Sequence, residues 1–133
     1  MPSDAPLRIA DAFFDAIVRG DLDRVREIYA DDAVIWHAHT GREQTREQNL
    51  AVLAHALKAI EGFRYEEVRR SATADGFVEQ HVLRGRAPGG ELEVPACIVV
   101  RLEGGRIRRL DEYMDSKALA PLLAGAAARR KEA

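Results

Sequence analysis

The sequence is poor in cysteine, tryptophan and proline, with one, one and five residues of these types in 133, and aromatic residues make up only 6% of it. A single cysteine, Cys97, excludes an intramolecular disulfide and a zinc site built from several thiolates of one chain. No stretch approaches the ~20 apolar residues of a membrane-spanning helix, and the first residues do not combine a basic segment with an apolar one. We therefore expect a cytoplasmic protein that does not use a membrane as a partner.

Charge of one sign is also lacking, because 20 basic and 22 acidic side chains are mixed along the chain and leave a net charge of -2. This balance argues against a nucleic-acid partner, which would need a basic surface. The length suits one domain with a real core and one ligand-sized cavity. We expect a single domain over 1–133, with an ordered core over about 5–122 and a frayed tail over 124–133.

The first part of the chain has helical periodicity. Apolar residues recur at helical spacing over 7–17 and stop at Gly20, a residue type common just after a helix. Asp21 is expected to cap a second short helix, which ends at 31–32 and is followed by a strand over 33–38. The inner face of that second helix is expected to hold Val25, Ile28 and Tyr29. Thr45 and Gln48 have the spacing of a capping box and predict a third helix that ends near Gly62.

From Phe63 onward the apolar period changes to two, which is typical of strands. Turn signals at Asp75-Gly76, Pro88-Gly89-Gly90 and Gly104-Gly105 separate the runs. The predicted strands are 63–73, 77–86, 91–102 and 106–114. Helices followed by an antiparallel meander predict an α+β fold, in which a curved antiparallel sheet wraps around the N-terminal helices.

One run carries a resemblance to a known fold. The segment 20–37 begins with Gly20-Asp21-Leu22-Asp23, continues through Asp31-Asp32-Ala33 and ends on a strand with Trp36-His37. It resembles the start of the cone-shaped fold shared by nuclear transport factor 2, ketosteroid isomerase and SnoaL-like polyketide cyclases. The resemblance implies a cone with an apolar pocket, a homodimer formed through the outer face of the sheet, and no cofactor.

The same resemblance argues against ketosteroid isomerase activity. In the isomerases a tyrosine seven residues before the Gly-Asp-Leu-Asp turn and a protonated aspartic acid in the penultimate strand donate to the enolate oxygen. The matching positions here are Phe13 and Ile98, neither of which can donate. Losing one such donor typically costs ~100-fold or more in rate. Trp36-His37, Gly41 and the phrase 110–115 instead resemble the broader SnoaL-like group, whose substrates and chemistry vary.

His37 is the first candidate catalytic residue, because it falls where the isomerases keep their general base. Imidazole has an ordinary pKa near ~6.5 and exchanges a proton readily at neutral pH. The structural alternative is a polar residue at a strand end that bonds to the following loop. Alternation puts His37 and His39 on one face of the strand and Trp36 on the other.

His81 is the second candidate. Glu79 lies two residues earlier on the same predicted strand face and is therefore able to orient the imidazole. The alternative is a cross-strand polar pair on the exposed or dimerising face of the sheet. Two histidines and a glutamate would suit a divalent metal, but no ligand spacing on a helix supports one, and we expect no metal site.

Glu112 is the third candidate. In limonene epoxide hydrolases, which share the cone fold, a catalytic aspartate lies in a phrase of the final strand similar to Leu110-Asp111-Glu112-Tyr113-Met114-Asp115. The resemblance puts Glu112 at the position of that catalytic aspartate. It also implies an Asp-Arg pair and a Tyr-Asn pair that hold the water, but the sequence does not show which residues would form them. A carboxyl among apolar neighbours tends to have a raised pKa and can act as an acid. An ordinary surface glutamate is the alternative.

Other residues are expected to be scaffold or pocket wall. The predicted substrate-binding set is Phe13, Ile17, Trp36, Leu53, Phe63, Ile98 and Met114. Asn49 is expected on an exposed helix face, and Cys97 as a small buried or interface residue. The outer sheet face, with Cys97, Val99, Arg101 and Tyr113, is the predicted dimer surface.

Two classes of function follow from these observations. The first is a cofactor-free enzyme acting on a small or polycyclic apolar carbonyl or epoxide compound, by proton transfer through His37 assisted by His81 or Glu112. The second is a non-catalytic module that binds an apolar small molecule or dimerises. The enzyme predicts an apolar cavity in which His37 converges with an acid or a second histidine, and the module predicts a filled core or isolated polar groups.

Overall fold

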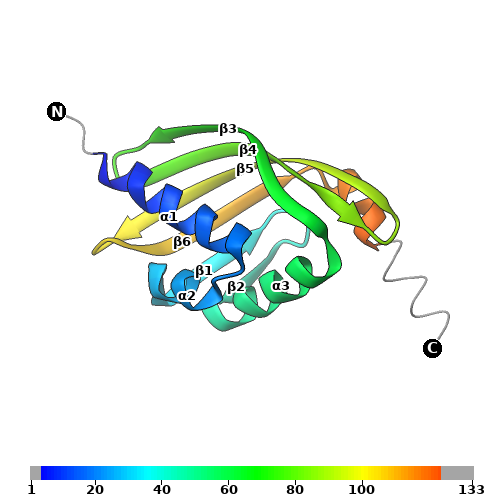
Figure 1. Cartoon of the computed structure of the whole chain (residues 1–133). Helices are drawn as coiled ribbons and strands as arrows, with labels where there is room; N and C mark the ends of the chain where they lie inside the picture. The colour runs from blue at the N-terminus through cyan, green and yellow to red at the C-terminus, as the bar shows by residue number, and fades with distance from the viewer. Residues whose placement is uncertain (1–3, 124–133) are drawn as a thin grey trace.

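The computed structural model describes residues 4–123, in which helices pack on one face of a six-stranded sheet (Figure 1). The helices are α1 (Ala5–Arg19), α2 (Leu22–Ile28), α3 (Arg46–Ala59) and the short 3-10 helix η1 (Ser116–Leu119). The strands are β1 (Tyr29–His37), β2 (Arg42–Thr45), β3 (Glu61–Ala72), β4 (Gly76–Ala87), β5 (Gly90–Glu103) and β6 (Arg106–Met114). The predicted frayed tail, 124–133, lies outside the described residues.

The helix boundaries follow from local capping. Gly20 ends α1 in the left-handed conformation, with φ 73°, and its N–H donates to the carbonyls of Ala16 and Ile17. At the start of α3, the backbone N–H of Gln48 donates to the Thr45 hydroxyl at 3.2 Å, and the Thr45 N–H donates back to the Gln48 side chain at 2.9 Å. The predicted capping box is confirmed.

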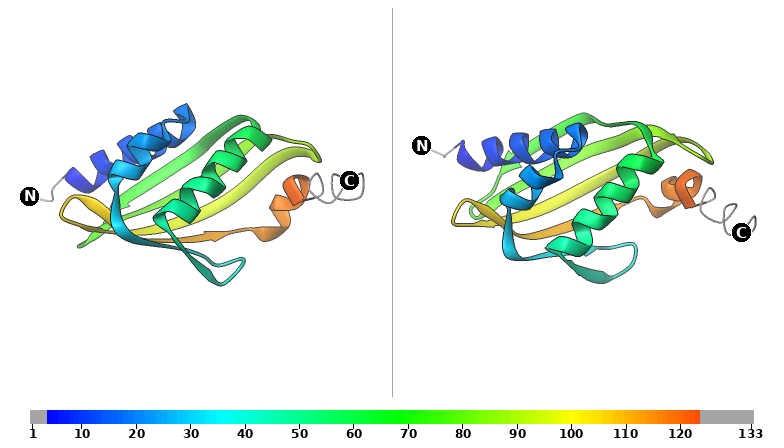
Figure 2. Two further views of the ribbon diagram at one scale, coloured as in Figure 1. Left: turned by 90° about the horizontal axis from the view of Figure 1, so that it is seen from below. Right: turned by 60° about the horizontal axis from the view of Figure 1, so that its bottom comes forward.

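The sheet has the strand order β2-β1-β6-β5-β4-β3 and is curved, with α1, α2 and α3 on its concave side (Figure 2). The predicted α+β fold is therefore confirmed. One pairing departs from a purely antiparallel sheet, because β1 runs parallel to β6. After β1 the chain forms β2 at one edge of the sheet and then passes through α3 to β3 at the opposite edge. Strands β4, β5 and β6 follow in order from that edge, so β6 ends beside β1.

Two local predictions near β1 are wrong. Tyr29 was expected on the second helix and the strand was expected to start at 33, but the strand begins at Tyr29 and includes Asp31 and Asp32. The register against β6 shifts between Tyr29 and Val34. The two exposed aspartates lie in this irregular segment of the strand. The short edge strand β2 was not predicted, because its four residues, Arg42–Thr45, carry no apolar alternation.

An irregularity in β3 decides which of its side chains face inward. The register against β4 shifts between Glu66 and Arg69, and Glu67 has a positive φ of 54°. Such a bulge inserts one extra residue and reverses the alternation beyond it. Tyr65 and Arg70 are five positions apart and would point to opposite faces of a regular strand, yet both lie on the inner face here.

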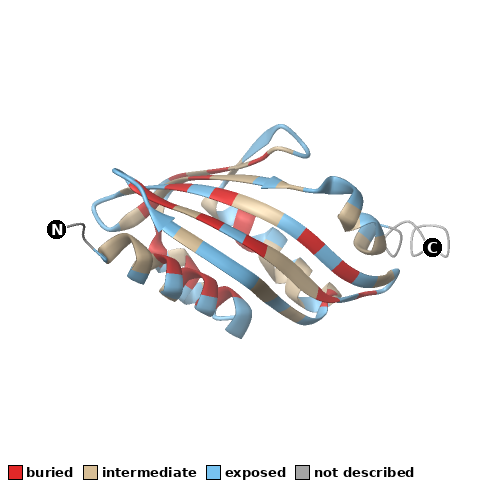
Figure 3. Cartoon of the chain, turned by 90° about the horizontal axis from the view of Figure 1, so that it is seen from above, coloured by how far each residue is buried: buried red, intermediate tan, exposed pale blue. Residues whose placement is uncertain are grey.

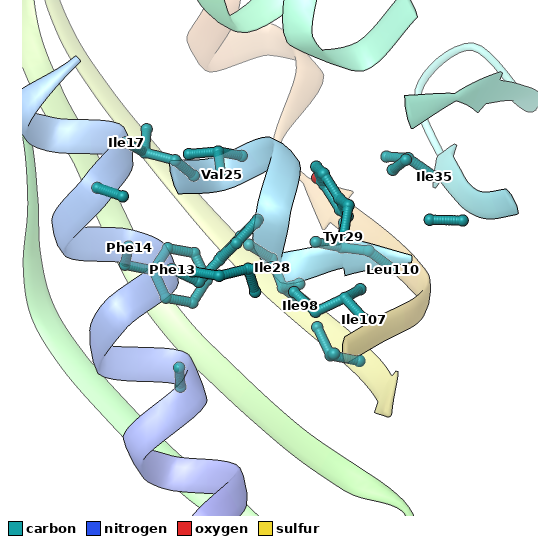
Figure 4. Packing of buried hydrophobic residues seen from close by; sticks show 14 of the residues in the cluster. Phe13, Phe14, Ile17, Val25, Ile28, Tyr29, Ile35, Ile98, Ile107 and Leu110 are labelled. Atoms are coloured by element: carbon teal, nitrogen blue, oxygen red, sulfur yellow. The ribbon is translucent and has the colours of Figure 1, made fainter. Parts of the chain in front are cut away.

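The main core fills the space between α1, α2 and the concave side of the sheet (Figure 4). Phe13 and Phe14 lie on the inner side of α1, where their rings meet edge to face at 5.0 Å. Along β4 and β5, buried residues alternate with exposed and half-buried ones, as expected of strands with one covered face (Figure 3). The helices therefore cover one face of the sheet and leave the other open.

Candidate active site

A cavity of about 200 Å³ lies within the cone and is lined mainly by apolar side chains from α1, α3 and the inner face of the sheet. Its wall also holds seven residues with proton-exchanging or hydrogen-bonding side chains: Tyr29, His37, His39, Asn49, Tyr65, His81 and Glu112. Two residues at its edge, His39 and Val52, are exposed, so the cavity reaches solvent on that side. An apolar chamber with a few convergent polar groups is the usual form of a small-molecule site.

Six of the seven residues predicted to bind substrate line this cavity: Phe13, Ile17, Leu53, Phe63, Ile98 and Met114. Trp36 does not, and its placement in that set was wrong. Its ring lies 5.4 Å from that of Tyr113 and packs edge to face against it on the outer face of the sheet. The reason is the alternation along β1, which turns Trp36 outward wherever His37 faces inward.

His37 and Glu112 form one polar pair in the wall. They are backbone partners across the β1 and β6 pairing, and His37 Nε2 lies 3.2 Å from Glu112 Oε1. Both side chains are largely shielded, with exposed fractions of 11% and 19%. Glu112 is not an ordinary surface glutamate, since its side chain lines the cavity. The backbone carbonyl of His37 accepts hydrogen bonds from Thr40 and Gly41 of the following loop, while the imidazole lines the cavity beside Glu112. His39 is exposed and stacks edge to face on His37 at 5.6 Å.

A second polar group lies beside this pair. The buried hydroxyl of Tyr29 donates to Asn49 Oδ1 at 2.8 Å, and Asn49 Nδ2 donates to Gln44 Oε1 at 3.2 Å. Asn49 is only 4% exposed, so the expectation of an exposed helix face was wrong. Position 49 lies in the first turn of α3, where the helix packs against β1 and the amide meets the Tyr29 phenol. Burial, and then the charge of Glu112, raise the pKa of Tyr29 far above its ordinary value.

The third polar group lies across the cavity, on β4 and β3. His81 Nδ1 is 2.5 Å from Glu79 Oε2, and the other Glu79 oxygen accepts a hydrogen bond from Arg70 Nε. Glu79 is fully buried and His81 nearly so, which corrects the alternative that the pair lies on an exposed or dimerising face. Arg70 also bonds to Asp11 of α1 at the surface. A buried carboxylate needs such a cation, because an unpaired charge is costly to bury.

These groups share one row across the sheet. Backbone pairing sets Arg70 opposite Glu79, Glu79 opposite Ile98, Ile98 opposite Glu112, and Glu112 opposite His37. Ile98, which lines the cavity, therefore separates the His37–Glu112 pair from the Glu79–Arg70 pair, whose members do not line it. His37 and His81 face the same cavity from strands three positions apart, so each histidine has its own carboxylate and they do not pair with each other.

Tyr65 was not singled out from the sequence, although it follows Phe63 by two residues on the same strand face. Its ring packs against His81, with centroids 4.3 Å apart. Burial raises the pKa of Tyr65 well above its ordinary value, and the negative charges of Glu112 and Glu79 raise it further. The phenol therefore stays protonated at neutral pH.

Raising the pH above about 10 should destabilise the protein, because the unfolded chain ionises its tyrosines there while Tyr29 and Tyr65 stay protonated in the folded state. The pKa of each tyrosine is higher in the folded state than in the unfolded chain, where it is about 10. Their contribution to stability is therefore complete below pH ~10 and is lost as the pH rises above it. Each residue contributes a slope of up to about 1.4 kcal/mol per pH unit. Urea unfolding over the alkaline range should show a shallower slope for Tyr29→Phe; an unchanged slope would contradict the assignment.

The oxyanion donors of the isomerases have no counterparts at the matching positions. Phe13 is 1% exposed and packs edge to face on Tyr29 at 5.3 Å, and Ile98 is buried between the two polar pairs. Among residues 4–123, no cluster of three or more histidine, cysteine, aspartate or glutamate side chains has a geometry able to hold a metal ion. The same residues contain no helix that is long and apolar enough to span a bilayer.

A curved sheet wrapped around helices, with His37, Glu112 and His81 lining an apolar cavity, defines an α+β protein with the cone fold. The profile of the SnoaL-like domain family matches residues 10–110, most of the chain and nearly all of the elements that build the cavity. The chain belongs to the SnoaL-like domain family.

Solved structures show the same fold. A SnoaL-like polyketide cyclase from Shewanella denitrificans has a TM-score of 0.79 and 14% identity, over 92% of this chain and 98% of that one. A LEH-like epoxide hydrolase from M. tuberculosis has a TM-score of 0.75 and 20% identity, over 98% of both chains. A protein with a ketosteroid isomerase-like fold from Catenulispora acidiphila, in complex with trimethylamine, has a TM-score of 0.73 and 21% identity, over 90% and 92%. No curated protein matches the sequence.

Proposed function

We propose that the protein is a cofactor-free enzyme that carries out acid/base chemistry on a small apolar epoxide or carbonyl compound. The observation that carries the proposal is the His37–Glu112 pair, with 3.2 Å between Nε2 and Oε1, in the wall of an apolar cavity. A non-catalytic module would be expected to hold a filled core or isolated polar groups. Convergent ionisable groups around open space favour the enzyme.

His37 and Glu112 act together as the proton acceptor. A neutral His37 donates its Nε2 hydrogen to the Glu112 carboxylate, which fixes the ring and leaves the pair able to take up one proton. When a substrate or water loses that proton, the bonding electrons stay on its carbon or oxygen.

Epoxide hydrolysis is the reaction that the arrangement favours. The resemblance to limonene epoxide hydrolases implies a Tyr-Asn pair and an Asp-Arg pair. Tyr29 and Asn49 form a Tyr-Asn pair in the cavity wall, and Glu79 and Arg70, with glutamate in place of aspartate, pair next to the wall without lining it. In this reaction the His37–Glu112 pair takes a proton from water, whose oxygen attacks an epoxide carbon while the ring C–O bond breaks. The opened oxygen then takes a proton from protonated His81 across the cavity. Water and epoxide become a diol, and solvent restores both groups.

Proton abstraction beside a carbonyl is the second candidate. The same pair would take the proton from carbon, and the electrons would move to the carbonyl oxygen as an enolate, as in isomerase or cyclase chemistry. Its support is the fold shared with the SnoaL-like polyketide cyclase. For either reaction, a cavity of about 200 Å³ favours a substrate with one ring over a polycyclic one, since sites for larger ligands usually exceed about 300 Å³.

Two assays on the purified protein test this function. Cyclohexene oxide should be converted to the diol faster than in buffer, and 2-cyclohexen-1-one should exchange its acidic hydrogens with deuterated water if the carbonyl reaction is the native one. His37→Ala should reduce the active reaction at least about 100-fold, the lower range for loss of a general base. Equal rates for the two proteins would remove His37 from the mechanism.

We also propose a homodimer formed through the outer face of the sheet, as the family resemblance implies. Val99 and Tyr113 are 37% and 48% exposed on that face. Cys97 pairs with Tyr113 across β5 and β6 and lies two residues from Val99, so all three residues share the face. Light scattering should give twice the 14.8 kDa mass of one chain for the wild type and one chain for Val99→Glu. A wild type that runs as a monomer would contradict the dimer.

A further inference from the structure

We infer that Tyr65 is a further catalytic residue, whose phenol donates a hydrogen bond to the oxygen atom of the bound substrate. The inference rests on the proposed function, because it assigns a role within the same cavity. Tyr65 comes from β3, a strand for which no catalytic residue was predicted.

The Tyr65 ring is held in place from three sides. Its centroid lies 5.3 Å from that of Phe63 and 5.4 Å from that of Phe14, both edge to face. On the third side the His81 imidazole lies 4.3 Å away at an interplanar angle of 33°. A side chain packed in this way has one orientation, which is what a preorganised donor requires.

The Tyr65 hydroxyl is free where the Tyr29 hydroxyl is not. Tyr29 donates its proton to Asn49 Oδ1 at 2.8 Å. The Tyr65 side chain makes no hydrogen bond within residues 4–123. In the same range, every fully buried side-chain nitrogen or oxygen has a hydrogen-bond partner. Its hydroxyl must therefore have accessible surface. Tyr65 lines the cavity and also a surface groove between α1 and β3. Its phenol senses Glu112, a carboxylate of the cavity wall, which assigns the hydroxyl to the cavity side.

Charge keeps this phenol in its donating form. Burial and the two carboxylates raise the pKa of Tyr65, so the hydroxyl retains its proton throughout the neutral range. The same carboxylates repel an anionic ligand group at rest. They leave the phenol proton available to an oxygen that gains charge only as the epoxide opens or the enolate forms.

The mechanism needs such a donor at this place. The developing oxyanion must be met by hydrogen-bond donors, and Phe13 and Ile98 supply none. Tyr65 packs against His81 on the β3 and β4 side of the cavity, whereas His37 projects into it from β1. Base and donor therefore approach the substrate from different strands. Loss of one oxyanion donor typically costs about 10²–10³ in kcat, which is the effect we expect for Tyr65→Phe.

The direct test is the infrared carbonyl band of 2-cyclohexen-1-one bound to the protein, because a hydrogen bond to the oxygen lowers its stretching frequency. The band should be lowered in the wild type and in Tyr113→Phe, and should move back toward its position in an apolar solvent in Tyr65→Phe. Both variants remove one tyrosine hydroxyl and keep the ring, and Tyr113 does not line the cavity. Thermal unfolding checks that Tyr65→Phe, whose ring contacts are all retained, is folded.

A measurement that needs no change at Tyr65 supports the same conclusion if that variant is unstable. In protein labelled at tyrosine Cζ with ¹³C, the Tyr65 resonance should shift on addition of the ketone, with assignment by Tyr29→Phe and Tyr113→Phe. A band lowered equally in all three proteins would overturn the role of Tyr65 and leave the proposed function standing. A wild-type protein that does not bind the ketone would count against both, and an unshifted band in bound wild type would overturn the donor alone.

Discussion

Replacing Glu112 by glutamine should lower kcat for cyclohexene oxide hydrolysis by about 10²–10⁴, the usual contribution of a positioned acid or base. The amide keeps the size of the side chain and can still bond to His37, whose Nε2 lies 3.2 Å from the carboxylate, but it cannot share the transferred proton. Diol formation measured under substrate saturation reports the change in kcat. KM should change much less, because the apolar wall that binds the substrate is intact.

The neighbouring carboxylate on β6 is the matched control for this variant. Asp111 faces the other side of the sheet, where it accepts a hydrogen bond from Arg109 Nε at 2.9 Å and does not line the cavity. Asp111→Asn makes the same chemical change one residue away and should leave kcat within about threefold. Equal losses in the two variants would point to a general effect on β6 and would contradict the role of Glu112.

Replacing Arg70 by methionine should lower the free energy of unfolding by about 3–5 kcal/mol, the usual cost of removing one partner from a buried ion pair. The fully buried Glu79 carboxylate would lose the guanidinium that bonds to one of its oxygens and keep only His81 on the other. Methionine retains much of the apolar length of the arginine stem, so most of the loss reports charge. Urea unfolding at neutral pH measures it.

Arg84→Met is the comparison for this second prediction. Arg84 bonds to Glu67 and Glu93 on β3 and β5, and both carboxylates are more than half exposed. Exposed pairs usually contribute less than about 1 kcal/mol, so this variant should be nearly as stable as the wild type. A similar loss of unfolding free energy in Arg70→Met and Arg84→Met would contradict the claim that Arg70 stabilises the protein by pairing with the buried Glu79 carboxylate.

Local signals in the sequence were sufficient for most of the fold. Capping at Gly20 and Thr45 and the alternation over 91–102 depend on neighbours in the chain, and the structure has the corresponding elements close to their predicted bounds. The start of β1 was mispredicted because Tyr29 and Ile28 also fit the inner face of a helix. The edge strand β2 was missed because its pairing with β1, rather than its own composition, makes it a strand.

The site was predictable only in part, because contacts between segments distant in the chain decide which side chains face inward. Alternation places Glu112 and His81 on strand faces, but which face is inward depends on tertiary packing. Arg70 lies on the inner side of the sheet only because the bulge at Glu67 reverses the alternation of β3, and no residue pattern in the sequence predicts that bulge. Asn49 is buried because α3 packs against β1, a contact between segments that are distant in the chain.

The mass of the diol formed from cyclohexene oxide in ¹⁸O-labelled water, with enzyme in excess so that each molecule turns over once, tests the central claim most directly. If the His37–Glu112 pair activates water, the first diol formed carries one ¹⁸O atom, and Glu112→Gln forms it far more slowly. An unlabelled first diol would mean that a side-chain oxygen attacks the epoxide. That result, or no diol above the buffer blank, would contradict the proposed acid/base mechanism.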